Sequence, residues 1–500
     1  MSTKARQSSQ LGSGNGFAGH PDGLAPLFLT ELWERFSYYG MRALLTRYMV
    51  APREAGGLEL SVPEAAAIYG NYTMAVYMLA LPGGFVADNH IGAKRAVMIG
   101  GSLIALGHYT LAVPAASSFY VGLILVALGT GLFKPSISAL VGALYAKGDP
   151  RRDAGFSIFY MGINIGALAA PIVTGFLAQS DTFRGWLVAA GLDARTSWHW
   201  GFAAAGIGMT LAMIAFMRRR DLLGGIGEEP MTTAPGRRQL TRLGLVGVGT
   251  LALLALTVLS DRDGFTWLRG LFVAGPLAAA AILGLSPDPE RRRLAAIAVL
   301  LVASMVFWAM FEQAGLSIAL FADQLTRADV AGVSFPSAWF QSLNALFVIV
   351  LAPVFAWGWI RLGPRQPSEP VKFVLGLVLL ALSFALMVPA AALTATGKVS
   401  PLWLVALFFV QTLGELCLSP VGLSTMTKLA PARLTGVALG LWFLGAAWGN
   451  KLAGIVGAGY TPDAAGLQRF FLVQAGMVAA AAFILLAMVP WLKRLMAGTE

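Results

Sequence analysis

Charged residues and cysteine are both scarce in this sequence. Of the 500 residues, 12% are charged and 57% are hydrophobic, whereas a soluble domain carries about 25% charged residues. Apolar runs recur along the whole chain, each close to the roughly 20 residues that cross a hydrocarbon layer about 30 Å thick. The sequence therefore predicts an all-α membrane protein with the lipid bilayer as its surroundings.

The sequence lacks the residues that several kinds of site chemistry require. Cys417 is the single cysteine, which excludes a disulfide within the chain. The chain has no G-x-S-x-G or H-E-x-x-H motif, the patterns of a serine nucleophile and of a zinc pair. An intramembrane enzyme with Glu31 and Glu34 as its acid–base pair is therefore disfavoured, and we expect no cofactor or metal. The first 22 residues contain no apolar stretch, so we expect no cleaved signal peptide.

The formal net charge is +11, and the placement of the basic residues explains it. Basic residues gather in alternate loops: Lys94/Arg95, Lys147/Arg151/Arg152, Arg218 to Arg220, Arg291 to Arg293, Arg361/Arg365/Lys372, Lys428/Arg433 and Lys493/Arg494. By the positive-inside rule, these loops and both termini are predicted to be cytoplasmic, in a multi-pass protein of the cell inner membrane. Because topology accounts for the charge, we expect no nucleic-acid partner.

Polar breaks divide the apolar runs into sets of six, two and six spans. The predicted spans are 24–50, 64–87, 96–114, 118–145, 154–178, 199–217, then 242–260 and 265–285, then 294–322, 336–360, 371–395, 401–427, 434–456 and 468–492. The predicted domains are a cytoplasmic tail (1–23), a six-helix bundle (24–217), a linker (218–241), an inserted helix pair (242–293), a second six-helix bundle (294–492) and a tail (493–500). Paired six-helix halves are a common plan of transporters, which suits a gated carrier better than a channel.

The first span carries a charged stripe. On a helix, Glu31, Glu34, Arg35, Tyr38 and Arg42 all lie within about 60° of the direction of Glu31. A charge at the bilayer centre costs at least about 2.5 to 3.5 kcal/mol, so the stripe is predicted to face a watery cavity. A carboxylate beside an arginine is stabilised as an anion, and it can take up a proton when the arginine moves to another anion. The alternative is a purely structural ion pair.

The segment GFVADNHIGAKR at residues 84–95 resembles the loop between the second and third helices of the major facilitator superfamily. Gly84, Asp88, Gly92 and Arg95 match that motif, and Asn89 stands where a basic residue is usual. The resemblance implies the superfamily fold, with Asp88 and Arg95 in a cytoplasmic gating latch. The alternative is a plain charged turn.

Three further segments resemble signatures of the proton-dependent oligopeptide transporter (POT/PTR2) family, and of its bacterial peptide transporters in particular. They are ELWERFSYYGMR from Glu31 to Arg42, FYMGINIGA from Phe159 to Ala167, and GELCLSPVGLS from Gly414 to Ser424. The matches are well separated, and the resemblance covers nearly the whole chain. It implies two six-helix bundles with two extra transmembrane helices between them, fourteen in all.

The resemblance also implies a site for short peptides. Arg42 and Lys134 would bind the peptide carboxylate, and Glu415 would receive the amino group. Further peptide-binding residues expected by similarity, or as apolar pocket walls, are Tyr38, Tyr39, Tyr77, Asn164, Trp308, Gln341, Asn344, Ser419 and Trp442. Lys134 could instead reach an interface, and either tryptophan could serve packing alone.

Proton coupling is assigned to carboxylates and their basic partners. The four histidines lie in loops or near span ends, and Gly70 stands where animal members of the family carry a histidine. The proton-coupling residues implied are Glu31, Glu34, Arg35, Lys134 and Glu312. Glu312 matches an acid linked to closing the external gate, although a structural hydrogen bond within the bundle is the alternative.

The expected function is therefore symport of protons with di- and tripeptides, by alternating access and as a monomer. The alternative is a transporter of the same fold that carries another small solute, such as nitrate, an amino-acid derivative or a drug, because fold does not fix function. The opposed charges of Arg42, Lys134 and Glu415 favour a zwitterion over nitrate.

Overall fold

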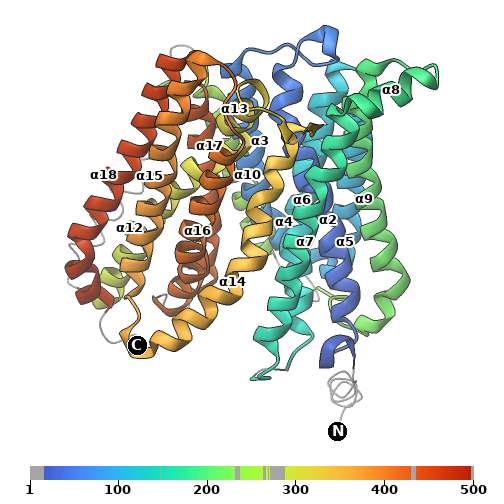
Figure 1. The fold of residues 1–500 in the computed structure, drawn as a ribbon. Coiled ribbons are helices and arrows are strands. Elements are labelled where there is room, and N and C mark those ends of the chain that lie inside the picture. The colour runs from blue at the N-terminus through green and yellow to red at the C-terminus, as the bar shows by residue number, and fades with distance from the viewer. Residues whose placement is uncertain are drawn as a thin grey trace. The chain divides into compact units, whose positions relative to one another are not determined.

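The structure is a computed structural model that describes residues 16–146, 148–230, 237–262, 266–267, 270, 288–330, 332–429 and 435–496. Its contacts divide the chain into two compact units (Figure 1). The N-terminal unit comprises Met1–Leu58 and Met78–Ala252, and the C-terminal unit comprises Glu59–Tyr77 and Leu253–Glu500.

Helices occupy the predicted spans of the N-terminal half. They are α2 (Leu24–Val50), α3 (Val62–Met78), α4 (Ala80–Val86), α5 (Ala93–Leu111), α6 (Ala116–Ala143), α7 (Arg152–Gln179), α8 (Asp181–Ala189) and α9 (Ser197–Arg219). The short α8 was not predicted. Its N-terminus is capped by Ser180, whose hydroxyl accepts a hydrogen bond from the backbone N–H of Phe183. The predicted second span is divided between α3 and α4.

The later helices also follow the predicted spans. They are α10 (Arg237–Leu259), α12 (Pro289–Phe311), α13 (Ser317–Gln324), α14 (Ser342–Leu362), α15 (Glu369–Leu393), α16 (Leu402–Leu429), α17 (Thr435–Gly457) and α18 (Ala464–Met496). The predicted span 294–322, the first of the second set of six, is interrupted by a 3-10 turn at Glu312–Gly315. A two-residue antiparallel pair, β1 (Asp329–Val330) and β2 (Val333–Ser334), precedes α14. Most of the predicted span 265–285 lies outside the described residues.

The two units repeat one packing scheme. In the N-terminal unit, α2 packs on α7 and α9, α5 packs on α6 and α9, and α4 packs on α6. In the C-terminal unit, α12 packs on α17 and α18, α15 packs on α16 and α18, and α14 packs on α16. These pairs occupy the same places in the two sets of six, which is the internal repeat expected of a transporter built from two halves.

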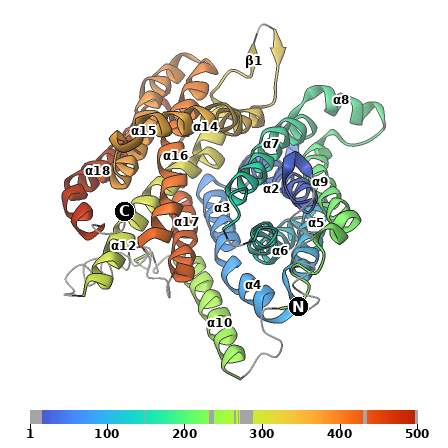
Figure 2. The ribbon, with the colours of Figure 1, turned by 90° about the horizontal axis from the view of Figure 1, so that it is seen from below.

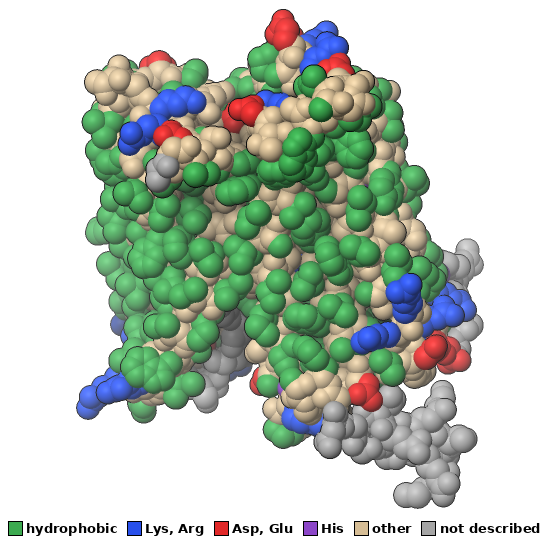
Figure 3. All heavy atoms as spheres, turned by 45° about the vertical axis from the view of Figure 1, so that its right-hand side comes forward, with side chains coloured by type: hydrophobic (Ala, Val, Ile, Leu, Met, Phe, Trp, Pro, Cys, Tyr) green, Lys and Arg blue, Asp and Glu red, His purple; other side chains and the backbone are tan. Residues whose placement is uncertain are grey.

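The exposed surface suits a lipid environment. Large apolar side chains such as Leu106, Ile124 and Ile207 are about half exposed, and hydrophobic side chains cover the middle of the face shown in Figure 3. Among the described helices, eight are long and apolar enough to cross a membrane. The helix α2 is not one of them because it carries Glu31, Glu34 and Arg35 within one apolar stretch.

Candidate functional site

The charged stripe of α2 is buried inside the N-terminal unit. Glu31, Glu34 and Arg35 are 4%, 1% and 6% exposed, and Tyr38 and Arg42 are also buried. All five members of the predicted stripe are therefore shielded within the unit. The helix α2 packs on α7 and α9, which lie beside it in Figure 2.

One arginine binds both carboxylates of the stripe. Arg35 Nε lies 3.1 Å from Glu31 Oε1, and it also donates a hydrogen bond to Glu34 Oε2. Within the described part of the chain, the second oxygens, Glu31 Oε2 and Glu34 Oε1, have no hydrogen-bond partner. The ammonium of Lys134, on α6, is close enough to act electrostatically on Glu31. The cluster thus joins two acids to one shared guanidinium, beside a second cation.

Aromatic rings extend the cluster along α2. The guanidinium carbon of Arg35 lies 5.4 Å from the ring centre of Tyr38, and that of Arg42 lies 5.8 Å from the ring centre of Tyr39. The two tyrosine rings meet edge to face. These contacts hold the guanidinium groups of Arg35 and Arg42 against the faces of two tyrosine rings.

A glycine of α7 sets the close approach of α2. A Cβ at Gly166 would overlap the carbonyl oxygen of Leu32 and lie 3.1 Å from Cβ of Arg35. Two residues earlier, the buried Asn164 donates a hydrogen bond to the carbonyl oxygen of Tyr160, 3.0 Å away. The FYMGINIGA segment therefore contributes directly to the placement of the charged cluster.

Substituting valine for Gly166 is expected to destabilise the protein and displace Arg35. The added side chain must push α7 away from α2, and overpacking of this kind costs about 1–3 kcal/mol. The measurement is the thermal unfolding temperature of the purified protein in detergent. Gly476→Val, on an exposed face of α18 where a Cβ meets no atom within 4 Å, is the control. Equal unfolding temperatures for the two variants would contradict this account of the helix contact.

The C-terminal unit contains a second set of the predicted site residues. Glu415, on α16, is half-buried and accepts a hydrogen bond of 2.8 Å from Asn344 Nδ2 on α14. The same amide nitrogen lies 3.1 Å from Thr412 Oγ1. Gln341, at the start of α14, donates to the carbonyl oxygen of Ala314. The Glu415 carboxylate is therefore oriented by Asn344, whose amide also contacts Thr412 of α16.

Glu312 lies at the break between α12 and α13. Its Oε2 accepts a hydrogen bond of 3.2 Å from the hydroxyl of Tyr69 on α3. That hydroxyl occupies the space that a Cβ at Gly315 would fill, so a glycine is required there. Breaks of this kind expose backbone groups and are common at transport sites.

The remaining predicted residues of this unit are mainly packed among other side chains. Trp308 meets Phe307 and Phe311 edge to face, and the buried Trp442 lies edge to face with Phe373. Tyr77 and Ser419 are half-buried. The two tryptophans thus belong to aromatic clusters of the unit.

The predicted latch residues are both exposed. No ion pair joins Asp88 and Arg95 in the described part of the chain. The neighbouring Lys94 is buried instead, and its ammonium lies 3.0 Å from Glu228 Oε1 in the linker. Gly92 has a φ of +79°, and a Cβ there would lie 2.7 Å from the carbonyl oxygen of Glu228. The linker is thus bound to the start of α5, a contact that the sequence motif did not indicate.

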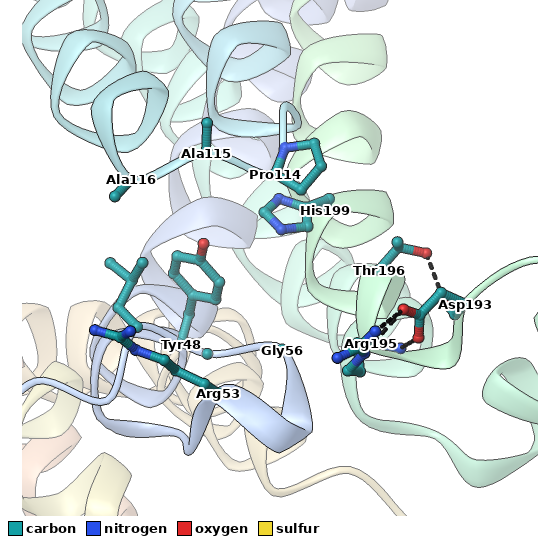
Figure 4. Close-up of a pocket in the computed structure, with 12 residues that line it drawn as sticks. Tyr48, Arg53, Gly56, Pro114, Ala115, Ala116, Asp193, Arg195, Thr196 and His199 are labelled. Atoms are coloured by element: carbon teal, nitrogen blue, oxygen red, sulfur yellow. Dashed lines mark hydrogen bonds and ion pairs between the residues drawn. The ribbon is translucent and has the colours of Figure 1, made fainter.

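A pocket of about 360 Å³ lies elsewhere in the N-terminal unit, and it contains none of the predicted site residues. Figure 4 shows it near the C-terminal end of α2 and the start of α9. Arg195, one of its walls, is paired with Asp193 at 2.6 Å, and hydrogen bonds from Arg195 lower the pKa of Asp193. The lining residues are Tyr48, Arg53, Gly56, Gly57, Leu58, Pro114, Ala115, Ala116, Asp193, Arg195, Thr196 and His199.

Comparison with known proteins identifies the family. The family model described as "PTR2: POT family" matches residues 94–228 and 248–463. The chain belongs to the POT family. Peptide transporter YePEPT of Yersinia enterocolitica is 41% identical over 99% of this chain and 98% of its own length. A di-/tripeptide transporter of Lactococcus lactis is 39% identical over 86% of this chain and 87% of its own.

Solved structures of the POT family have the same fold. A mutant of a peptide transporter POT, in complex with alafosfalin, matches with a TM-score of 0.87 and 42% identity over 100% of both chains. A POT family transporter in complex with 5-aminolevulinic acid matches with a TM-score of 0.84 and 30% identity over 97% of this chain and 100% of its own. The predictions of family and fold class are thus confirmed: this POT family member is a multi-pass membrane transporter with the major facilitator fold, and not an enzyme.

Proposed function

We propose that this protein is a proton-coupled importer of di- and tripeptides, acting as a monomer in the cell inner membrane with both termini in the cytoplasm. Relatives named as peptide transporters that match over most of their length support the substrate class. The observation that carries the proposal is the buried cluster of Glu31, Glu34 and Arg35 near Lys134. A buried group of two acids sharing one cation is the kind of element that can exchange protons with a ligand-dependent partner.

Peptide recognition would use charges of opposite sign. A short peptide carries an anionic and a cationic end, so its site needs a cation for the first and an acid for the second. Arg42 and Lys134, in the N-terminal unit, would bind the carboxylate. Glu415, oriented by Asn344 in the C-terminal unit, would bind the amino group. Recognition of the termini and backbone predicts broad tolerance of side chains and a strict limit on length.

Proton coupling would follow from competition for cations. When a peptide carboxylate draws Lys134 or Arg42 toward itself, the acids of α2 lose positive charge nearby. A buried carboxylate with less positive charge nearby favours its protonated form. Within the described residues, Glu31 Oε2 and Glu34 Oε1 have no hydrogen-bond partner and could each accept the proton. Binding of the peptide and the proton would therefore support each other, with Glu312 and the latch of Asp88 and Arg95 serving the gates.

The test is uptake of labelled dialanine into liposomes that contain the purified protein. Each proton that enters adds roughly 2.3 kcal/mol per 100 mV, so a potential of about 100 mV can sustain accumulation of a neutral peptide of roughly 40-fold. We expect accumulation with an inward proton gradient, and equilibration only when an ionophore collapses the gradient. Absence of dialanine transport under both conditions would refute the substrate assignment.

A second candidate substrate class is a small amino acid derivative. The relative in complex with 5-aminolevulinic acid is 30% identical over nearly the full chain. That compound also carries an amino group and a carboxylate at opposite ends, so the same opposed charges could bind it. Competition of 5-aminolevulinic acid with labelled dialanine would show whether both use one site, and uptake of the acid without any dialanine uptake would favour the second class.

A further inference from the structure

A buried lysine of α17 binds a carboxylate from the region 242–293 between the two sets of six spans, which we call the inserted segment. Lys451 is 1% exposed, and its ammonium lies 2.7 Å from both Oδ1 and Oδ2 of Asp261. Asp261 follows the end of α10, where Ser260 is fully buried and its hydroxyl donates to the carbonyl oxygen of Thr257. The C-terminal end of α10 is therefore held inside the C-terminal unit.

An asparagine of α3 completes a three-way contact. Asn71 Oδ1 lies 2.7 Å from the ammonium of Lys451, and Asn71 Nδ2 donates to Asp261 Oδ2 at 2.8 Å. Each of the three side chains thus contacts the other two. They come from segments 190 and 380 residues apart in the sequence, so the cluster joins α3, the inserted segment and α17.

The same part of α3 makes close backbone contacts with α17. A Cβ at Gly70 would lie 3.0 Å from Cα of Gly454, and a Cβ at Gly454 would lie 2.6 Å from the carbonyl oxygen of Ala66. The two helices run side by side in the view of Figure 2. Tyr69, the residue preceding Gly70, donates a hydrogen bond to Glu312. Three successive residues of α3 thus contact three different parts of the C-terminal unit.

These contacts matter because the chain passes between the units at α3. Residues 59–77 belong to the C-terminal unit, whereas Met78 and the following helix α4 belong to the N-terminal unit. If the units move relative to each other, α3 must either stay with the C-terminal unit or break these contacts. Which of the two occurs depends on the strength of the contacts of Tyr69, Gly70 and Asn71 with the C-terminal unit.

We propose that the inserted segment supplies, through Asp261, the counter-ion that holds Lys451 and Asn71 together and thereby fixes α3 to the C-terminal unit. The described part of the inserted segment then has a task, because Asp261 is a positioning residue for the helix α3. Asp261 is the decisive member since it is the acid of the cluster. Removing it leaves an ammonium buried without its carboxylate, which is far less favourable than replacing the whole pair by apolar groups.

The consequence for transport rests on the proposed alternating-access function. In that cycle the cluster favours the state in which α3 stays with the C-terminal unit, so weakening it should shift the balance between conformations and alter the rate of peptide exchange. Whether the cluster holds α3 can be measured without any transport assay. The claim that the cluster holds α3 and the claim that this protein transports peptides can therefore be refuted separately.

The test uses the reactivity of one introduced cysteine. Ala66 is 2% exposed, and its backbone lies against Gly454, so Ala66→Cys in a Cys417→Ala background reports separation of α3 from α17. In liposomes, Asp261→Asn is expected to raise the rate of alkylation by a small maleimide about tenfold. Lys451→Met should raise it less, and the double variant Asp261→Asn/Lys451→Met should return it to the value of Lys451→Met.

Asp329→Asn, at an exposed position of β1 in the same unit, is the matched control and should leave the rate unchanged. Alkylation of Asp261→Asn at the control rate would overturn the proposal. The proposal requires that removing the lysine relieves the loss of the acid. It would therefore also be overturned if the double variant reacts as fast as Asp261→Asn. The same holds if the double variant cannot be recovered folded although Lys451→Met can. Exchange of dialanine, measured on the same samples, tests the link to transport separately.

Discussion

Glu34→Gln is expected to abolish gradient-driven accumulation of dialanine while exchange of labelled for unlabelled dialanine continues. Glutamine keeps the size of the side chain and can still accept a hydrogen bond from Arg35, so the helix contact should survive. It cannot take up a proton, so the gradient no longer drives the peptide. An accumulation ratio of roughly 40-fold at 100 mV should fall to about 1.

Two measurements make this prediction specific. Glu54→Gln, in an exposed turn after α2, is the matched control and should accumulate dialanine normally. Exchange with equal pH on both sides reports peptide binding and translocation without a proton gradient, and in Glu34→Gln its rate should no longer depend on that pH. Full gradient-driven accumulation by Glu34→Gln would remove this acid from the coupling mechanism, whereas loss of exchange as well would indicate a structural role.

Glu415→Gln is expected to weaken dialanine binding roughly 10- to 150-fold, because a hydrogen bond to a charged group contributes about 1.5–3 kcal/mol. Glutamine can still accept the hydrogen bond that Asn344 donates to Glu415, so the orientation of the side chain should be kept. The loss should appear in KM for dialanine. Thermal stability should change little.

Modified substrates provide the control for this prediction. N-acetyl-dialanine has no charged amino group, so the parent protein should already bind it poorly and Glu415→Gln should lose nothing further. The complementary pair is Arg42→Gln with dialanine amide, which lacks the carboxylate. If Glu415→Gln weakens dialanine and N-acetyl-dialanine by the same factor, Glu415 does not bind the amino group.

Much of the fold followed from local pattern. Apolar run length predicted helices such as α2, whose observed bounds Leu24–Val50 equal those of the predicted span. Helical periodicity placed Glu31, Glu34 and Arg35 on one face, and the structure shows Arg35 bound to both acids. These features depend only on near neighbours in sequence, so one sequence is sufficient to predict them.

Features that depend on distant contacts were not predicted. The 3-10 turn at Glu312–Gly315 lies within an apolar run, and the space beside it is filled by Tyr69 from a segment 243 residues away in sequence. The pairing of Lys94 with Glu228 joins a motif to the polar linker, 134 residues later in the sequence. No local signal predicts either contact.

The cluster of Lys451 shows what signal was available. A lysine in the middle of an apolar run needs an acid or a polar partner, and this signal is present at Lys451 although no role was predicted for it. The signal does not indicate which partner, because Asp261 lies 190 residues earlier, beyond the end of another helix. The roles of Arg42, Lys134 and Glu415 in peptide binding depend on family resemblance, and they stay predictions until variants are measured.

The central claim is that peptide and proton cross the membrane together. The most direct test is whether a gradient of peptide alone moves protons across the membrane. Liposomes containing the protein and a trapped pH-sensitive dye are clamped at zero membrane potential and equal pH, and dialanine is then added outside. We predict acidification of the lumen, which Glu34→Gln abolishes. Entry of labelled dialanine without acidification would contradict the account and make this protein a carrier that is not coupled to protons.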